Sequence, residues 1–236
     1  MQIDVLTLFP KMFDSVLGES MMKRAQNKAL VRIKIHNLRD WTSDRHRSAD
    51  DKPFGGGPGM VMKVEPVYRA LKELKVLRST QNAVRKTKDA VMVILLTPQG
   101  KRLDQKSVKR LAKCKKLVLI CGHYEGVDER IRALADDEIS IGDYILTCGE
   151  IPALAVIDSV VRLIPGVLGD SSSIDSESFE NDLLEYPQYT RPADFLEMKV
   201  PQVLLCGDHK RIDKWRKNEA VKRTKIRRPD LIKKEK

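Results

Sequence analysis

Three glycine-containing loops are the clearest candidates for chemistry in this sequence. LTPQG (Leu96–Gly100) and CGHYEG (Cys121–Gly126) directly follow continuous apolar runs, and IGDYILTCGEIP (Ile141–Pro152) is the third. Ligands of parallel sheets bind beyond the carboxyl ends of the strands. If the loops converge, their main-chain N–H and C=O groups would suit an uncharged planar ring such as adenine. If they do not converge, they are ordinary turns.

A second segment, Asp44–Gly59, is dense in charge and in glycine. Asp50 and Asp51 in this segment could act as a general base or as a pair of ligands. They could equally cap local structure and form ion pairs with Arg45 and Arg47. The sequence leaves both interpretations open.

Several signatures of common enzyme classes are absent from the sequence. It contains no GxxxxGK[ST], no GxGxxG, no HExxH and no GxSxG motif, which argues against P-loop, dinucleotide-binding, zincin and α/β-hydrolase chemistry. The four cysteines form no CxxC pair, so we expect no metal site and reduced thiols in a cytoplasmic protein. The longest apolar runs are far shorter than the ~18 residues of a membrane span, so we expect no membrane partner.

Alternating strand-like and helix-like segments must position these loops. Such alternation predicts an α/β domain with a parallel sheet, because runs such as AVMVILL and LVLIC have the length of strands buried on both faces. The segment Ile151–Ile164 is apolar around most of its circumference and predicts a buried helix or an oligomer interface. The expected strands are Ile3–Phe9, Val31–His36, Ala90–Leu96, Leu117–Cys121 and, more weakly, Ile139–Leu146. The expected helices are Pro10–Ala29, Val64–Leu77, Ser107–Lys113, Val127–Ala135 and Ile151–Ile164.

Charge is distributed unevenly along the 236 residues. The chain has 44 Lys plus Arg against 33 Asp plus Glu, a net charge of +11, which favours a polyanionic partner such as nucleic acid. Residues 163–205 contain eight acidic and two basic residues, whereas residues 206–236 contain thirteen basic and five acidic ones. The small, polar run Gly169–Ser178 cannot bury enough apolar surface to become ordered. We therefore predict an α/β domain over 1–162, a flexible linker over 163–178 and a basic, all-helical domain over 179–236, with Asp208 capping one helix and Pro229 opening another.

Eight segments in one order carry a resemblance to a known family. Each segment alone is weak, but the ordered set is specific and spans essentially the whole chain: LTLFP, DRHRSADDKPFGGGPGM, LTPQG, CGHYEGVDER, SIGDYILTCGE, RLIPGVLG, EYPQYTRP and RRPDL. Together they resemble the bacterial tRNA (guanine-N1)-methyltransferases, TrmD, of the SPOUT superfamily. The resemblance implies a deep trefoil knot in the first domain, bent S-adenosylmethionine bound in that knot, and a homodimer with shared active sites. It also implies methylation of N1 of guanosine 37, next to the tRNA anticodon, when a guanosine precedes it.

The same resemblance implies which residues hold the cofactor and perform the reaction. Arg162 matches the arginine that approaches the target guanine, and Glu177 stands at the position of the general base, with Asp175 as the alternative. Cys148 departs from the family by occupying a position where glycine is common. The implied cofactor-binding residues are Leu96, Thr97, Pro98, Gly122, Tyr124, Glu125, Gly126, Ile141, Gly142, Asp143, Tyr144, Ile145, Leu146, Gly149 and Pro152.

These residue types fit the chemistry of guanine N1. Neutral N1 carries a proton, so a carboxylate that takes this proton and a guanidinium that stabilises charge on O6 would assist methyl transfer. The basic C-terminal helices would hold the tRNA anticodon stem-loop through its phosphates, with steep salt dependence. Two other functions stay open from the sequence: a non-catalytic RNA-binding protein, and a methyltransferase of the same fold that acts on the ribose 2′-oxygen.

Overall fold

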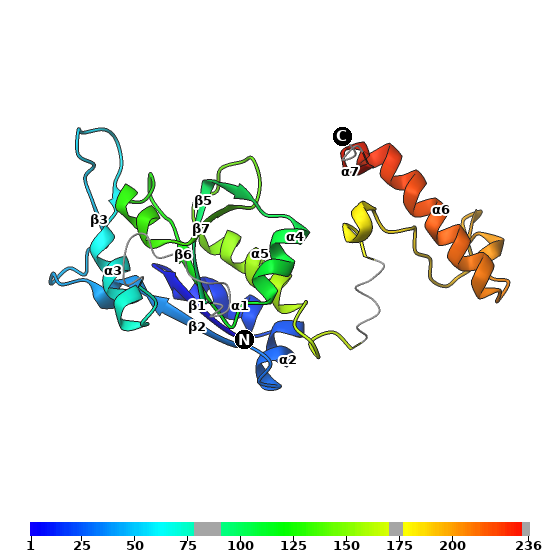
Figure 1. Ribbon diagram of the computed structural model, residues 1–236, viewed down its shortest axis with the longest axis horizontal. Helices are drawn as coiled ribbons and strands as arrows, with labels where there is room; N and C mark the ends of the chain where they lie inside the picture. Colours follow the sequence, from blue (N-terminus) through cyan, green and yellow to red (C-terminus); the bar gives the residue numbers. More distant parts are fainter. Residues whose placement is uncertain (78–90, 170–176, 233–236) are drawn as a thin grey trace. The chain divides into compact units, whose positions relative to one another are not determined.

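The computed structural model describes residues 1–77, 91–169 and 177–232 (Figure 1), and the chain divides into two compact units, Met1–Gly169 and Asp170–Lys236. Unit 1 contains a five-stranded sheet of order β2-β1-β6-β5-β7, in which all neighbouring strands are parallel. The expected α/β class with a parallel sheet is therefore confirmed. The strands are β1 (Gln2–Thr7), β2 (Arg32–Asn37), β5 (Val91–Arg102), β6 (Lys116–Cys121) and β7 (Asp137–Ser140).

Two hydrophobic clusters cover the two faces of this sheet. Ile3 and Val5 of β1 belong to the cluster that packs under α4 (Gln105–Ala112) and α5 (Glu150–Val161), whereas Leu6 belongs to the cluster under α3 (Val64–Glu73). Figure 1 shows α3 on one side of the sheet and α4 and α5 on the other. Because both faces are buried, the central strands are apolar at nearly every position, which explains why the sequence displays them as continuous runs.

The helices of unit 1 lie near their predicted positions, but several differ from the predictions in length or type. The continuous helix expected over Pro10–Ala29 is wrong. Gly18 and Glu19, which has an extended backbone, divide this segment into separate short helices. The segment expected as Val127–Ala135 forms a 3-10 helix, which begins at the cap that Asp128 provides for the N–H of Arg130. The helical elements are η1 (Pro10–Phe13), α1 (Asp14–Leu17), α2 (Ser20–Asn27), η2 (Leu38–Trp41), α3 (Val64–Glu73), α4 (Gln105–Ala112), η3 (Glu129–Leu134) and α5 (Glu150–Val161).

The last strand of the sheet is shorter than the sequence predicts. The expected strand Ile139–Leu146 ends at Ser140, because the Ser140 hydroxyl donates to the carbonyl of Gly142 (2.9 Å) and accepts from its N–H (3.2 Å). A serine that bonds the backbone two residues ahead favours a turn over a strand. Residues 141–149 are consequently free to form a loop.

Unit 2 is built around one long helix, as expected, but it is not all-helical. Asp208 accepts a hydrogen bond from the N–H of Arg211 (3.1 Å) and thereby caps α6 (His209–Arg227), and Pro229 opens α7 (Pro229–Ile232). The all-helical prediction is wrong because β8 (Asp194–Phe195) and β9 (Met198–Lys199) pair antiparallel. The pairing of these two strands satisfies backbone groups without a helix. Two short 3-10 segments complete the unit: η5 (Glu180–Asp182) and η6 (Gln202–Leu204).

The start of the predicted linker belongs to unit 1. Val167 is 5% exposed and packs in the core under α5, and its N–H donates to the carbonyl of Ile164 (3.1 Å). Residues 163–169 (LIPGVLG) are apolar and are held by these core contacts, so the first part of the predicted linker is wrong. Asp175, the alternative base, lies outside the described residues.

Candidate active site

The three glycine loops meet at one end of the sheet in unit 1. The N–H of Gly149 in the third loop donates to the carbonyl of Gly122 in the second (2.8 Å). A Cβ at Gly122 would lie 3.4 Å from the carbonyl oxygen of Leu96 in the first loop. Between the loops lies a cavity of about 410 Å³, a volume typical of small-molecule sites. The loops are therefore not independent turns.

Nearly all of the expected cofactor-binding residues line this cavity. The exception is Asp143, which does not line it and instead lies 4.0 Å from the Arg102 guanidinium on the surface. The lining residues among those expected are Leu96, Thr97, Pro98, Gly122, Tyr124, Glu125, Gly126, Ile141, Gly142, Tyr144, Ile145, Leu146, Gly149 and Pro152. The cavity is also lined by Val61, Gln99, His123, Val127, Glu129, Arg132, Ile139, Ser140, Thr147 and Cys148, which the sequence reasoning did not select.

Four of these ten additional lining residues carry a sequence signal in hindsight. Gln99, His123, Thr147 and Cys148 lie inside the three loop motifs and would follow from taking each loop whole. Val61 carries no such signal, because it lies on β4 (Val61–Met62), a short strand far from the loops in sequence.

Close backbone contact explains why glycine occupies position 149. A Cβ there would lie 2.6 Å from the nitrogen of Gly122 and 2.8 Å from the Cα of Cys121, which is closer than real Cβ atoms approach. Gly149 also precedes α5 directly, so the helix begins against the end of β6. The absence of a side chain at this position thus allows the second and third loops to form one wall.

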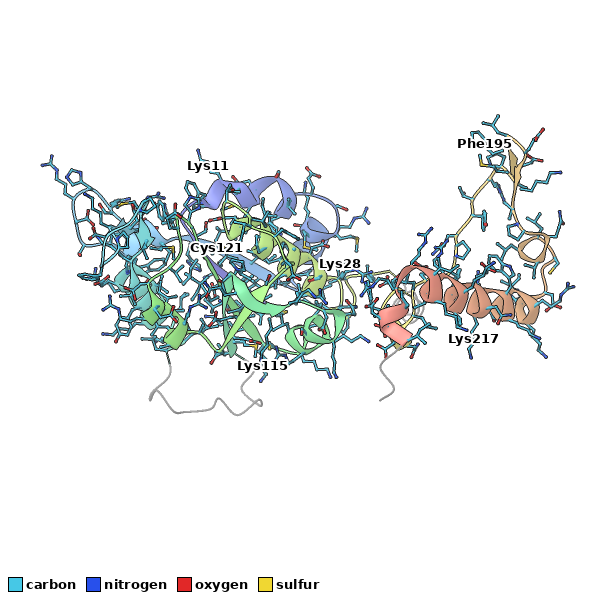
Figure 2. The ribbon with its side chains drawn as sticks, turned by 90° about the horizontal axis from the view of Figure 1, so that it is seen from above. Lys11, Lys28, Lys115, Cys121, Phe195 and Lys217 are labelled. Carbon is cyan, nitrogen blue, oxygen red and sulfur yellow. The ribbon has the colours of Figure 1, made fainter. Side chains whose placement is uncertain are left out.

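A buried carboxylate lies behind that wall. Glu150, the first residue of α5, is fully buried, and its Oε1 accepts a hydrogen bond from the Thr7 hydroxyl at the end of β1 (2.5 Å). The Thr7 oxygen in turn accepts from the N–H of Phe9 (2.8 Å). A carboxylate is favoured at a helix N-terminus. Burial, together with the charge of Glu150 and the Cys148 thiol, raises the pKa of Cys121 well above its ordinary value, so this interior thiol (Figure 2) stays protonated.

The segment that contains Asp50 and Asp51 packs against the second loop. The N–H of Glu125 donates to the carbonyl of Met60 (3.1 Å), and the N–H of Met62 donates to the carbonyl of Gly126 (3.0 Å). Tyr124 adopts a left-handed backbone (φ 62°). Burial raises the pKa of its hydroxyl, and the nearby carboxylate of Asp50 adds to that rise. Asp50 therefore faces the loop rather than pairing with a neighbouring arginine.

The rest of that segment is held by ion pairs that differ from the expected ones. Asp51 lies 4.0 Å from the Lys63 ammonium, and Arg47 lies 3.8 Å from Asp40. β3 (Asp50–Asp51) pairs antiparallel with β4. Asp51 is therefore explained by structure, whereas Asp50 acts electrostatically on Tyr124, which lines the cavity.

Arg132 connects three parts of the cavity wall. Its guanidinium donates to the side chain of Gln99 in the first loop (2.6 Å), to Glu129 in η3 (2.9 Å) and to Glu138 in β7. The pair with Glu138 is largely shielded from solvent and is stronger than a surface ion pair, whereas the Glu129 side chain is exposed. This arginine fixes the first loop relative to the edge of the sheet.

The two expected catalytic residues lie in different units, and Arg162, in unit 1, does not line the cavity. Arg162 immediately follows α5, so roughly 18 Å of helix separate it from the cavity-lining residues at the start of that helix. Glu177 belongs to unit 2, where it lines a hollow formed with α6 side chains such as Arg216 and Lys217. The described residues of one chain therefore form the expected cofactor site, and Arg162 of the same chain does not line it.

Comparison with known proteins agrees with this geometry. The family model "tRNA (Guanine-1)-methyltransferase TrmD" matches residues 1–234. The chain belongs to the TrmD family. The tRNA (guanine-N(1)-)-methyltransferases of Dictyoglomus turgidum and Endomicrobium trichonymphae are each 53% identical to it over 234 residues, which is 99% of this chain and 91% and 100% of those proteins. The same enzyme of Geobacillus kaustophilus is 53% identical over 233 residues, 98% of this chain and 91% of its own length.

Membership of the TrmD family confirms the resemblance that the sequence carries and implies that the site must hold a methyl donor. The cavity fits such a donor, because it combines apolar side chains such as Leu96 and Ile139 with the main-chain groups of three loops. Among the described residues, no group of three His, Cys, Asp or Glu side chains could hold a metal ion. In the same part of the chain, every helix is too short or too polar to cross a membrane.

Proposed function

We propose that this protein transfers a methyl group from S-adenosylmethionine to N1 of guanosine 37 in tRNA. The observation that carries this proposal is the match of the whole chain to the TrmD family, combined with a loop-walled cavity at the end of its parallel sheet. The relatives at 53% identity are named for the same reaction over the same length. The family further supports a guanosine before the target as part of the recognised sequence.

The cofactor-binding role is assigned to the residues that line the cavity. The main-chain groups of Leu96, Gly122 and Ile141–Leu146 are suited to hydrogen bonds with the adenine ring, and the adjacent apolar side chains exclude water from it. When bound, S-adenosylmethionine supplies an electrophilic methyl group on a sulfonium. Asp143 lies outside the lining, so we assign it no direct contact with the cofactor.

Glu177 and Arg162 have complementary parts in the reaction. A carboxylate at 177, or alternatively Asp175, takes the N1 proton of guanine, and the Arg162 guanidinium stabilises the negative charge that spreads to O6. An ordinary glutamate is a weak base, with a pKa of about 4.3, so assistance at O6 matters. The rate of proton removal therefore depends on both groups.

A homodimer with shared active sites would explain the position of Arg162. Because this residue lies at the far end of α5, a second subunit could bring its own Arg162 to the cavity. Exposed apolar side chains support such an interface, since Met12 and Val16 are 40% and 43% exposed and Ile151 on α5 is 46% exposed. The test uses the inactive variants Arg162→Ala and Glu177→Gln, which are mixed, unfolded and refolded together to form mixed dimers. If Arg162 and Glu177 of one site come from different subunits, one site of each mixed dimer contains both residues and activity returns.

The path of the chain supports the trefoil knot that the family implies. β7 is an edge strand beside β5, yet the following loop returns to Gly122 at the end of β6, and α5 begins beside Thr7 of β1. The chain thus crosses back over the ends of the central strands. Unit 2, with basic α6, is assigned to the tRNA anticodon stem-loop, and the four free thiols support a cytoplasmic protein.

One experiment tests the reaction, the substrate and the site together. The protein is incubated with S-adenosylmethionine and an unmodified tRNA transcript that carries guanosines at positions 36 and 37, and the digest is analysed by mass spectrometry. We expect 1-methylguanosine at position 37. A 2′-O-methylated nucleoside would indicate the ribose-directed reaction instead, and the absence of both methylation and cofactor binding would indicate a non-catalytic RNA-binding protein.

Substitutions then test the two catalytic roles. Glu177→Gln and Arg162→Ala should each lower turnover by about 10²-fold or more, because each removes a group that acts on the reacting guanine. Cofactor affinity measured by calorimetry should stay unchanged, since neither side chain lines the cavity. Near-normal turnover of Glu177→Gln would transfer the role of base to Asp175.

A further inference from the structure

The solvent-facing side of α4 is formed by cations. Val108 and Leu111 are buried in the core under this helix, and the opposite side carries Lys106, Lys109, Arg110 and Lys113. At 100° per residue these four side chains fall within one exposed stripe of the helix. The stripe therefore presents a row of positive charges about 10 Å long from Lys106 to Lys113.

Positive charge continues on both sides of the helix. Residues 101–115 contain seven lysines and arginines and one acidic residue, Asp104, which caps α4 through the N–H of Ser107 (2.7 Å). We use the name α4 basic surface for Lys101, Arg102, Lys106, Lys109, Arg110, Lys113 and Lys115. Figure 2 shows Lys115 at the margin of unit 1.

Few of these charges are neutralised by nearby carboxylates. Arg110 forms an ion pair with Asp137 (2.6 Å), and Arg102 lies 4.0 Å from Asp143. Within residues 1–77, 91–169 and 177–232, no carboxylate lies in ion-pair distance of Lys106, Lys113 or Lys115. Lys116, in contrast, is turned inward and lies 3.1 Å from buried Asp4. The exposed lysines therefore leave a strong local excess of positive charge.

The row of like charges on α4 destabilises the isolated helix. Lys106 and Arg110, and Lys109 and Lys113, are like charges four residues apart, and such pairs destabilise a helix. Lys106 also lies in the first turn, where the helix dipole disfavours a cation. Across the described segment 101–115 no large apolar side chain is exposed, so the surface is not built for a buried protein interface.

The α4 basic surface adjoins the candidate active site. Lys101 follows the first cofactor loop directly and shares a groove with Gln99 and Arg132, which also line the cofactor cavity. The same groove is lined by four acidic residues, Glu129, Asp136, Asp137 and Glu138, so the excess of positive charge lies on the α4 side of it. α4 lies beside α5 on the same side of the sheet (Figure 1). Lys101 lies on the cavity side, whereas Lys115 directly precedes β6 and lies at the opposite end of that strand from Gly122. An RNA backbone along the α4 basic surface would therefore run from the cavity toward the far end of the sheet.

We propose that the α4 basic surface binds the phosphate backbone of the tRNA substrate and so forms a binding surface separate from that of the basic helix α6. This inference rests on the proposed function, because it takes tRNA as the polyanion. Lysines on flexible stems suit phosphates, which need a positive charge but no fixed base-reading geometry. The interaction contributes affinity without sequence preference.

The test compares two triple variants that remove the same number of charges. Lys106→Gln, Lys113→Gln and Lys115→Gln are combined in one protein, and Lys34→Gln, Lys72→Gln and Lys75→Gln, at exposed positions on β2 and at the end of α3, are combined in the control. Binding of an unmodified tRNA transcript is measured across a range of salt concentrations, together with calorimetric binding of S-adenosylmethionine. We expect the α4 variant to bind tRNA about tenfold more weakly at low salt, and its salt slope to fall by roughly 1 for each phosphate that is no longer neutralised.

Each outcome decides the inference. Unchanged cofactor affinity and kcat with a raised KM for tRNA in the α4 variant alone would support it, whereas equal tRNA affinity in both variants would overturn it. If the triple variant does not fold, Lys106→Gln and Lys113→Gln are measured singly, and a salt slope equal to that of the unchanged protein then overturns it. Failure of the proposed function would be seen differently, as an absence of methyl transfer by the unchanged protein.

Discussion

At the scale of single residues, the Thr7–Glu150 pair decides how β1 and α5 meet behind the cofactor cavity. Thr7→Val removes the hydroxyl that donates to the buried Glu150 carboxylate and accepts from the N–H of Phe9. We expect a decrease of about 1–3 kcal/mol in the free energy of unfolding, because buried polar groups are left without their partner. Urea denaturation measures this decrease, and Thr7→Ser, which keeps the hydroxyl, should retain most of the stability. Equal decreases in the two variants would contradict the role of the hydrogen bond.

Asp4 makes the stability of unit 1 depend on pH. Burial of this carboxyl opposes its charged form, but hydrogen bonds with His36 (2.7 Å) and Lys116 (3.1 Å) more than compensate and hold the pKa of Asp4 below its ordinary value of 3.8. A pKa lowered in the folded state stabilises the protein above the unfolded pKa, and this contribution disappears as the pH falls below about 4.

Comparison with Asp4→Asn isolates this effect. At pH 6 the variant should be less stable by about 1–3 kcal/mol, because the His36 and Lys116 side chains no longer have a charged partner. Urea denaturation between pH 6 and pH 3 should show the difference from the unchanged protein shrinking below about pH 4. A difference that is constant across this range would show that the charge of Asp4 is not the source of its stabilising effect.

At the scale of elements, the wall formed by the second and third loops depends on backbone contact. Gly149→Ala would place a methyl group 2.6 Å from the nitrogen of Gly122, which neither loop can avoid without moving. We expect S-adenosylmethionine to bind at least tenfold more weakly by calorimetry, since several kcal/mol of overpacking strain fall on the binding loops. Gly169→Ala is the matched control, because a Cβ at that position meets no atom within 4 Å. A similar affinity in both variants would refute the steric explanation.

Elements that are determined by local chemistry could be predicted from the sequence. The apolar runs that form β5 and β6 are buried on both faces, and the Asp208 cap of α6 depends on residues three positions apart. Contacts between distant segments could not be predicted in this way. Glu150 and Thr7 are 143 positions apart in the sequence, so their hydrogen bond can be identified only in the folded structure. Val61 and Arg132 were not predicted for the same reason. They line the cavity through contacts with segments that are distant in the sequence.

At the scale of the whole molecule, the proposed function assigns the cofactor cavity to unit 1 and a tRNA-binding surface to both units. Unit 1 holds the cofactor cavity, and α6 of unit 2 carries exposed lysines such as Lys214 and Lys217 (Figure 2). Lys214→Gln with Lys217→Gln should raise the KM for tRNA several-fold and lower the salt slope by about 2, because two phosphates are no longer neutralised. The KM for S-adenosylmethionine should not change. Steady-state kinetics at several salt concentrations measure both values, and an unchanged tRNA KM would contradict the assignment of α6.

The pairing of β1 with β6 also has a consequence for synthesis on the ribosome. Gln2 lies opposite Lys116, so the first strand must wait for 114 further residues before one of its two edges is covered. At about 5–20 residues per second this wait lasts roughly 6–23 s. During that time β1 exposes Val5 and Leu6 beside an open row of backbone donors and acceptors, which is the form of nascent chain that chaperones bind and that aggregates at high rates of expression. A lower level of transcription, which reduces the concentration of nascent chains with an uncovered β1, should therefore increase the yield of folded protein.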